Sequence, residues 1–320
     1  MGRGVECDKS LPITDFSSVC NQWWELTPRF PRLTPGASAL DNWPLASENH
    51  PISGNKHMCT TFSPAELAQY ERDGYFLARG LFDREEVQKL LAFGQQDSSL
   101  FSAAYGRKDS TGRETKLALW NEAGEDLYSM FGRSPRIVDR LEQMLGGEVY
   151  LYHMKMNMKE PRVGGAWEWH QDYGYWYNNG CLYPLMASCM LAVTRSNKAN
   201  GCLQVLRGSH HLGRLDHGQT GDQAGADMER VNAAMERLEL VYVETEPGDA
   251  LFFHGNTLHR SDQNLSDEAR WSLICCYNAK ANNPYKESKH PRYTPLAKVD
   301  AEAIRRWQPT MPDAFTSPKR

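Results

Sequence analysis

His170 and Asp172 lie two positions apart in the aromatic segment Trp169-His-Gln-Asp-Tyr-Gly-Tyr-Trp176. On a β-strand, residues i and i+2 point to the same face, so these two side chains could bind one metal ion. The same pair also fits an ordinary strand whose histidine and aspartate are merely hydrogen-bonded or solvated. A metal site therefore requires a further ligand from elsewhere in the chain.

Two later histidines, His254 and His259, follow a predicted strand and could supply that ligand. Either one would complete a set of two histidines and one carboxylate with His170 and Asp172. Such a set holds iron(II) on three corners and leaves three positions open. The open positions would accommodate a bidentate cosubstrate and dioxygen.

Arg270 and Ser272 are also two residues apart, on a predicted strand near the end of the chain. The planar fork of an arginine suits a carboxylate, and a serine hydroxyl adds one donor. The pair therefore predicts a site for the distal carboxylate of a cosubstrate. A zinc hydrolase would have no use for this arginine, and a non-catalytic jelly-roll binding module would not need the full ligand set. Both remain the alternatives to an oxygenase.

The elements that must position these residues are mainly strands. Capping and periodicity signals predict helices over 64–72, 84–93 and 135–144, with a strand over 75–78. The alternating segment 153–159 predicts a strand whose methionine face packs against helices. Further strands are expected over residues 167–176, 185–194, 202–206, 239–245, 249–254 and 270–278. This order predicts a mainly β protein with flanking helices, built around a β-sandwich or barrel.

The 320 residues divide unevenly. Residues 1–58 are predicted to be a loop-rich N-terminal extension, although Met58 could also be the true start. Residues 59–290 would form the main domain, with a long insertion at about 212–237 of the kind that often forms a lid, and residues 291–320 a C-terminal extension.

Composition indicates a small-molecule partner. A net charge of −4 and a pI near 6.2 provide no basic field for nucleic acid. The eight cysteines form no Cys-x-x-Cys pair, so a disulfide framework is not expected. No apolar run is long enough for a membrane span, and the N-terminus lacks a signal peptide. We expect a cytoplasmic protein without membrane or nucleic-acid partners; the oligomeric state is not encoded in any pattern.

Several motifs resemble, in their order along residues 63–280, the phytanoyl-CoA dioxygenase-like branch of iron(II)/2-oxoglutarate oxygenases. They are Tyr70-Glu-Arg-Asp-Gly-Tyr75, His170-Gln-Asp172, Asn200-Gly-Cys-Leu-Gln-Val-Leu-Arg-Gly208-Ser-His210, Gly248-Asp-Ala-Leu-Phe-Phe-His254, and His259 followed by Arg270. Arg207 departs from the proline that the family commonly has there, which is expected to change a loop rather than the chemistry.

The resemblance implies a double-stranded β-helix, or cupin-like jelly roll, with iron(II) in one mouth. It favours His259 as the ligand, because the family's distal histidine usually precedes the oxoglutarate-binding arginine by about the eleven residues found here. It implies 2-oxoglutarate and dioxygen as cosubstrates, ascorbate as a possible stimulant, and Arg270 and Ser272 as the oxoglutarate grip. Since Asp172 fills the corner that a halogenase leaves to chloride, hydroxylation or a derived desaturation is expected.

The resemblance also places Asn157 near the cosubstrate, because related ectoine hydroxylases have an asparagine at the same interval before the first ligand. The alternating strand 153–159 puts Asn157 on a polar face, and such a face can equally meet solvent. The two interpretations remain open from the sequence.

Substrate recognition is the least defined feature. Tyr173, Tyr175 and Trp176 could cage an ammonium group, or they could be packing aromatics of a strand. Lys155 and Arg195 could meet an anionic group, or they could be surface residues. The expected substrate is a small amino- or trimethylammonium-bearing acid, an aminophosphonate or a natural-product intermediate, rather than an acyl-CoA.

Overall fold

The computed structural model describes residues 59–309. The predicted N-terminal extension and residues 310–320 lie outside this range. The helices are α1 (Pro64–Asp73), α2 (Arg84–Gln96), α3 (Ser98–Ala103), α4 (Leu127–Gly132), α5 (Pro135–Leu145), α6 (Asp172–Trp176), α7 (Met228–Met235) and α8 (Ala303–Arg306), with 3-10 turns at Tyr177–Asn179, Ser209–Leu212 and Lys280–Asn282.

Two antiparallel sheets and a hairpin make up the β structure. The larger sheet has seven strands in the order β1 (Tyr75–Ala78), β11 (Ala250–His254), β6 (Met186–Ala192), β13 (Arg270–Ala279), β4 (Val149–Lys159), β3 (Glu114–Trp120) and β2 (Tyr105–Lys108). The smaller sheet has four, in the order β10 (Leu240–Val243), β7 (Leu203–Leu206), β12 (His259–Ser261) and β5 (Trp167–His170). The hairpin pairs β8 (His217–Thr220) with β9 (Gln223–Ala226).

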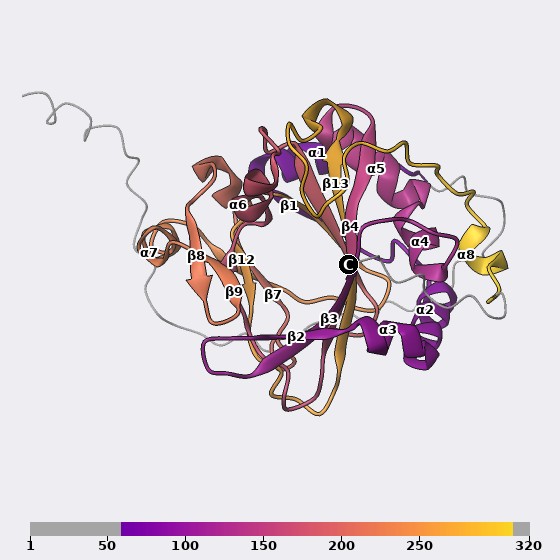
Figure 1. The fold of residues 1–320 in the computed structure, drawn as a ribbon, viewed down its shortest axis with the longest axis horizontal. Coiled ribbons are helices and arrows are strands. Elements are labelled where there is room, and N and C mark those ends of the chain that lie inside the picture. The colour runs from indigo at the N-terminus through magenta and orange to yellow at the C-terminus, as the bar shows by residue number, and fades with distance from the viewer. Residues whose placement is uncertain (1–58, 310–320) are drawn as a thin grey trace, which may run out of the picture. The chain divides into compact units, whose positions relative to one another are not determined.

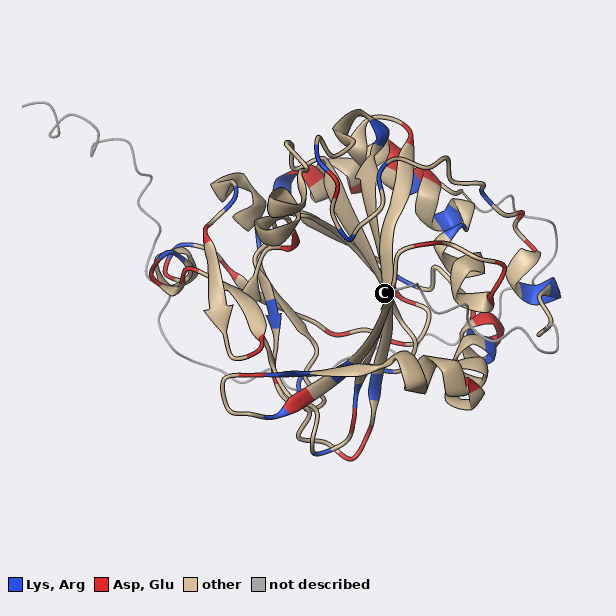
Figure 2. Ribbon diagram, viewed as in Figure 1, with Lys and Arg blue, Asp and Glu red and all other residues tan. Residues whose placement is uncertain are grey.

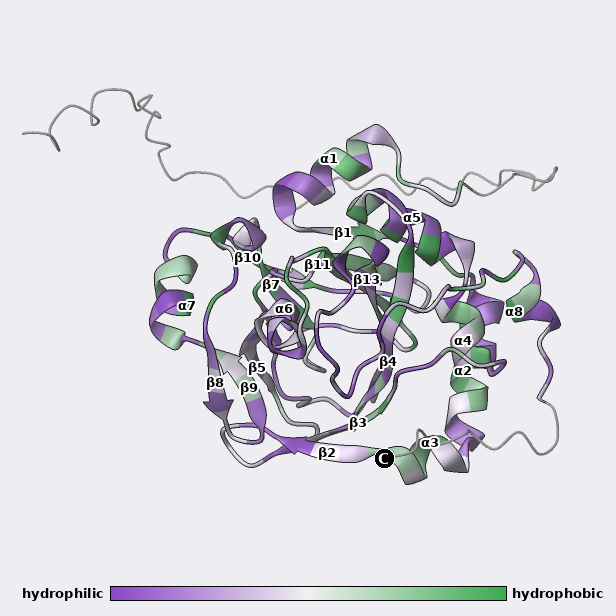
Figure 3. Ribbon diagram, turned by 45° about the horizontal axis from the view of Figure 1, so that its top comes forward, coloured by the Kyte–Doolittle hydropathy of each residue, from purple (hydrophilic) through white to green (hydrophobic). Residues whose placement is uncertain are grey.

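The layers form the predicted jelly roll. In Figure 1 the helices α2, α4 and α5 cover the outer side of the larger sheet, and the smaller sheet with β8, β9 and α7 lies on the opposite side. Hydrophilic and hydrophobic segments alternate along α2 and α5 (Figure 3), as expected for helices with one face on a core. Basic and acidic residues are interspersed around the ribbon (Figure 2). The described helices include none long and apolar enough to cross a bilayer.

The first helices form where their capping signals predicted. Ser63 and Glu66 make a reciprocal capping box at the start of α1, and Asp83 and Glu86 make another at the start of α2. Gly146 ends α5 in the left-handed conformation, at a φ of 73°. These three helices are confirmed within a few residues of their predicted ends.

Strand β4 divides its side chains between two interiors. Its methionines, Met154, Met156 and Met158, pack with residues of the covering helices, which confirms the prediction for this face. The pairing with β13 shifts register at Cys276/Tyr277, so that one residue of β4 has no partner there. Beyond this bulge the polar side chains of β4 point toward the space between the two sheets. These residues are His153, Lys155, Asn157 and Lys159.

The predicted strand over residues 167–176 is wrong beyond its first half. Strand β5 ends at His170, and Asp172 begins the short helix α6. The backbone N–H groups of Gln171 and Tyr173 bond outside any strand ladder, to His217 and to the carbonyl of Gly255. These tertiary bonds outweigh the strand preference of the aromatic residues.

The long insertion contains a hairpin, β8–β9, followed by α7, and β9 packs beside β5. Residues 291–309, predicted as a C-terminal extension, pack on the helices that cover the larger sheet. Ile304 is buried there, and Lys89 donates to the carbonyls of Ile304 and Arg305 at 3.0 and 2.7 Å.

The buried pair Arg136–Glu86 joins α5 to α2 through two bonds of 2.9 and 2.6 Å. Replacing Arg136 with methionine leaves a buried carboxylate without its partner, so the free energy of unfolding should fall by about 3–5 kcal/mol. The exposed pair Arg162–Asp267 provides the control, since Arg162→Met should lower the free energy of unfolding far less. Urea unfolding followed by circular dichroism measures the free energy of unfolding of both variants. An equal decrease in the two would contradict the claim that the buried pair stabilises the fold more than the exposed one.

Candidate active site

Three buried side chains converge at the mouth of the jelly roll. His170 at the end of β5 pairs with His259 at the start of β12, and Asp172 follows at the first position of α6. Asp172 Oδ1 lies 3.7 Å from His170 Nε2 and 4.0 Å from His259 Nε2. Their ligand atoms all fall within 4.8 Å of one another, and they are the one such cluster among residues 59–309. Two imidazoles and one carboxylate are the donor set of a facial iron(II) site.

Hydrogen bonds from the backbone and neighbours orient this set. The Nδ1 atoms of His170 and His259 face the carbonyls of Glu168 and Thr257 at 2.7 and 2.9 Å, so each Nε2 is left to a ligand. Asp172 Oδ2 accepts from the Ser188 hydroxyl at 3.0 Å. The donor set is therefore held with its metal-binding atoms directed toward one point.

Charge and burial favour the protonation states that bind metal. Burial lowers the pKa of His170 well below its usual value, and burial likewise lowers the pKa of His259. Burial acts to raise the pKa of Asp172, but the nearby charge of Lys155 and the hydrogen bond from Tyr175 act against it, and the pKa of Asp172 lies below its usual range. At neutral pH the site has two neutral imidazoles and a carboxylate, which fits an iron(II) ion.

Gln171 fixes the turn between the two ligands. Its side-chain amide donates to the carbonyls of Gly213 and Asn256, both at 2.7 Å, and its backbone N–H donates to His217 Nε2 at 2.9 Å. The His217 ring passes so close to α6 that a Cβ on Gly174 would lie 2.0 Å from it. The insertion thus braces the strand-to-helix turn on which the ligand geometry depends.

Tyr175 donates its hydroxyl to Asp172 Oδ1 at 2.7 Å, the oxygen that faces both histidines. Tyr175→Phe removes this bond, so we expect iron(II) affinity to fall about 10-fold or more. Tyr173→Phe is the matched control, because the Tyr173 hydroxyl donates to the carbonyl of Cys181 in the core. Anaerobic iron(II) titration measures both variants; equal affinities would show that the Tyr175 bond does not tune the site.

A second group of side chains lines the same cavity as the ligands. It includes Arg270 on β13 and Asn157 on β4. Ser272 pairs with Asn157 across the two strands and lies two residues from Arg270, on the same face of β13. Arg270 Nε, Ser272 Oγ and Asn157 Oδ1 are buried and have no hydrogen-bond partner within the described part of the chain. Burial lowers the pKa of Arg270 to about 10, which leaves it charged at neutral pH. A buried cation and polar atoms without a partner fit the carboxylate of 2-oxoglutarate that is remote from its 2-oxo acid end.

Lys159 lies beside this group but has its own partners. Its ammonium donates to the Ser261 hydroxyl at 2.9 Å and to the carbonyl of Asp262. Sequence reasoning placed Lys159 only on the polar face of its strand. Arg260, which also lines the cavity, pairs with Asp262, whereas no ion pair or hydrogen bond of the Arg270 guanidinium is found among residues 59–309.

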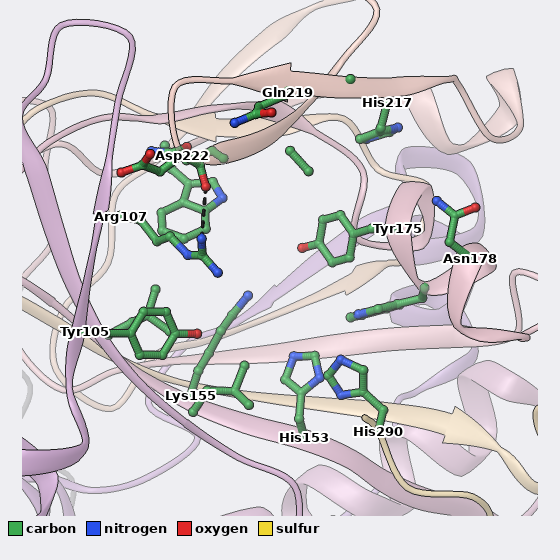
Figure 4. A pocket seen from close by; sticks show the side chains of 17 residues that line it. Tyr105, Arg107, His153, Lys155, Tyr175, Asn178, His217, Gln219, Asp222 and His290 are labelled. Carbon is green, nitrogen blue, oxygen red and sulfur yellow. Dashed lines mark hydrogen bonds between the residues drawn. The ribbon is translucent and has the colours of Figure 1, made fainter. Parts of the chain in front are cut away.

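A larger cavity of about 560 Å³ adjoins the first, and Lys155 and Trp167 line both. Its volume lies in the range of small-molecule sites. Of the substrate candidates, Tyr175, Trp176 and Lys155 line this cavity (Figure 4). Tyr173 does not line the cavity and is buried in a core cluster.

The structure also places Arg195 away from both cavities. Its side chain is exposed on the surface and pairs with Glu246 at 3.1 Å. Arg195 belongs to the loop between β6 and β7, so no strand directs its side chain toward the space between the sheets. His254 ends β11 and accepts from the backbone N–H of Asn256 at 3.0 Å, so it lies outside the ligand set.

Several residues that line the larger cavity were not predicted from the sequence. They are Tyr105, Arg107, His217, Gln219, Asp222 and His290. The hairpin carrying His217 had a signal, because Gly221-Asp222 is a two-residue turn between short runs. His290 had none, since it lies in a segment without regular structure and reaches the cavity only through tertiary packing.

Comparison with known proteins agrees with this geometry. The sequence model of phytanoyl-CoA dioxygenase (PhyH) matches residues 70–272. Ectoine dioxygenase from Bordetella parapertussis is 27% identical over 295 residues, spanning 86% of this chain and 96% of that protein. L-proline trans-4-hydroxylase from Streptomyces griseoviridis is 32% identical over 203 residues, spanning 56% of this chain and 75% of that protein.

Solved structures show the same fold. The crystal structure of EctD from S. alaskensis with 2-oxoglutarate and 5-hydroxyectoine superposes with a TM-score of 0.64 at 21% identity, over 78% of this chain and 90% of that one. The epimerase SnoN, in complex with Fe3+, alpha ketoglutarate and nogalamycin RO, gives a TM-score of 0.57 at 20% identity, over 75% and 96%. The predicted double-stranded β-helix is confirmed.

Proposed function

The chain belongs to the phytanoyl-CoA dioxygenase family, and we propose that His170, Asp172 and His259 hold the iron(II) with which it hydroxylates a small amino-acid-like substrate. The activity class is that of an iron(II)- and 2-oxoglutarate-dependent dioxygenase. When bound, iron(II) and 2-oxoglutarate supply the oxidation: dioxygen converts the oxo acid to succinate and carbon dioxide and delivers one oxygen atom to a C–H bond.

Arg270, Ser272 and Asn157 orient the cosubstrate in this proposal. The guanidinium of Arg270 pairs with the carboxylate remote from the metal, the Ser272 hydroxyl donates to it, and the Asn157 amide lies within the same cavity. This arrangement fixes the direction in which the diacid enters. The single observation that carries the proposal is that the orphaned polar atoms of Arg270 and Asn157 line one cavity with the ligand triad.

The larger cavity would bind the substrate and exclude water. The β8–β9 hairpin closes one side of it, and Arg107 holds the hairpin by donating to the carbonyl of Asp222 at 3.1 Å. Tyr175 and Trp176 form another wall next to the ligands. A substrate here would have its reacting C–H bond near the metal and its remaining groups against β2, β4 and the hairpin.

The related enzymes named for ectoine and L-proline support a substrate derived from an amino acid. We further propose a cytoplasmic location, since the six cysteines described in the structure are unpaired, as in a reducing compartment. No nucleic-acid or membrane partner forms part of the proposal.

The test is a turnover assay on the full chain. Anaerobically purified protein receives iron(II), 2-oxoglutarate and then oxygen, and succinate is measured with and without each member of a panel of small amino acids and their derivatives. Mass spectrometry should detect a panel compound that gains one oxygen atom in step with succinate. No succinate with any compound, together with no bound iron, would instead indicate a jelly-roll binding module.

A further inference from the structure

Lys155 is a buried lysine without a partner. The residue is 9% exposed, and no hydrogen bond or ion pair joins its ammonium to any residue from 59 to 309. Figure 4 shows the side chain extending from β4 into the larger cavity, between Arg107 and Tyr175. Lys155 lies near enough to Asp172 for its charge to lower the pKa of that carboxyl, but no hydrogen bond or ion pair joins the two side chains. The donors of the ammonium are therefore free for an anion that enters the larger cavity.

Two histidines lie next to Lys155 at the same wall. The rings of His153 and His290 are 5.2 Å apart, and the His290 ring stacks on Tyr152 at 4.7 Å. The Nδ1 atoms of both histidines are buried without a partner among the described residues. Each imidazole can therefore still give or accept one hydrogen bond inside the cavity.

The balance of charge in the cavity is positive. Burial and the neighbouring Lys155 lower the pKa of His153 well below its usual value and that of His290 to about 4, so both rings are neutral at neutral pH. The charged residues that line the cavity are Lys155, Arg107 and Asp222. One acidic residue therefore stands against two basic ones.

We propose that the substrate carries a carboxylate, bound by the Lys155 ammonium with His153 and His290 alongside it. This inference rests on the proposed function and narrows its substrate class to an acid whose anionic end points toward β4. Asp172, the carboxylate on which the charge of Lys155 acts, belongs to the ligand set and is not left for a substrate ammonium at that end. A quaternary ammonium against Tyr175 would meet the like charge of Lys155.

The competing role for Lys155 is to bind 2-oxoglutarate, since it also lines the smaller cavity. Arg270 already provides an unpaired cation for one carboxylate of that diacid, and the iron binds the other end. The histidines beside Lys155 line the larger cavity and not the smaller one. If Lys155 binds 2-oxoglutarate, its replacement should weaken 2-oxoglutarate binding. If Lys155 binds the substrate, its replacement should leave 2-oxoglutarate affinity largely unchanged.

The test compares small carboxylic acids with their primary amides, for example L-proline with L-prolinamide. Binding to anaerobic protein loaded with iron(II) and 2-oxoglutarate is followed by calorimetry. Wild type should prefer the acids, and Lys155→Gln should weaken binding of the best acid about 10- to 100-fold and remove the preference over its amide. Lys155→Arg should restore much of it. Lys116→Gln on the exposed side of β3 is the control and should change nothing.

The proposal is overturned if no acid binds wild type more tightly than its amide. It is also overturned if Lys155→Gln leaves acid binding unchanged, or weakens 2-oxoglutarate binding as much as acid binding. Because binding is measured without oxygen, the result is independent of turnover. Acid binding that depends on Lys155 in a protein that forms no succinate would refute the proposed function and leave this inference standing.

Discussion

Replacing His259 with alanine is expected to abolish succinate formation, whereas the same change at His254 should leave it largely intact. The two histidines are five residues apart and follow the same strand, so sequence alone leaves both available. Of these two histidines, His259 is the one that lies in the ligand cluster, with its Nε2 4.0 Å from Asp172 Oδ1. Losing one of three protein ligands should leave iron(II) too weakly held for turnover.

The measurement is succinate produced per chain under saturating iron(II) and 2-oxoglutarate, together with bound iron after gel filtration. Urea unfolding of both variants establishes that each is folded. Activity retained in His259→Ala and lost in His254→Ala would contradict the ligand assignment.

Replacing Arg270 with leucine should raise the KM for 2-oxoglutarate by about 2 to 3.5 orders of magnitude, because it removes a buried charge pair worth about 3–5 kcal/mol. Arg270 is 3% exposed and its Nε has no partner among the described residues, so its interaction is reserved for a ligand. Arg270→Lys should fall between, since it keeps the charge but loses the planar fork.

Arg195→Leu provides the control for this series, because Arg195 is exposed and pairs with Glu246 on the surface. Steady-state succinate assays at varied 2-oxoglutarate, with iron(II) held constant, give the KM of each variant. A KM unchanged in Arg270→Leu would show that the diacid does not reach β13.

The ligand pair illustrates what spacing can and cannot predict. His170 and Asp172 were expected to converge because they share a strand face, yet the strand ends between them. They still converge, because the turn at Gln171 is held by bonds to Gly213, Asn256 and His217. These partners are more than forty residues away in sequence, so no local pattern could reveal the turn.

The alternating strands were more predictable. Arg270 does face the cavity of the ligands, and the methionines of β4 face the helices, because alternation is intrinsic to a strand. The position of Asn157 required the structure, since the polar face of a strand meets either solvent or an interior. The surroundings of Lys155 likewise required the structure, because His290 reaches the same cavity from the C-terminal segment.

The most direct measurement of the central claim is the location of the metal. Crystals grown without oxygen in iron(II) and 2-oxoglutarate would give an anomalous difference map at the iron edge. The expected result is one peak per chain between His170 Nε2, His259 Nε2 and Asp172 Oδ1, with the diacid extending from it to Arg270. A peak at any other set of side chains, or a diacid directed away from Arg270, would contradict the account.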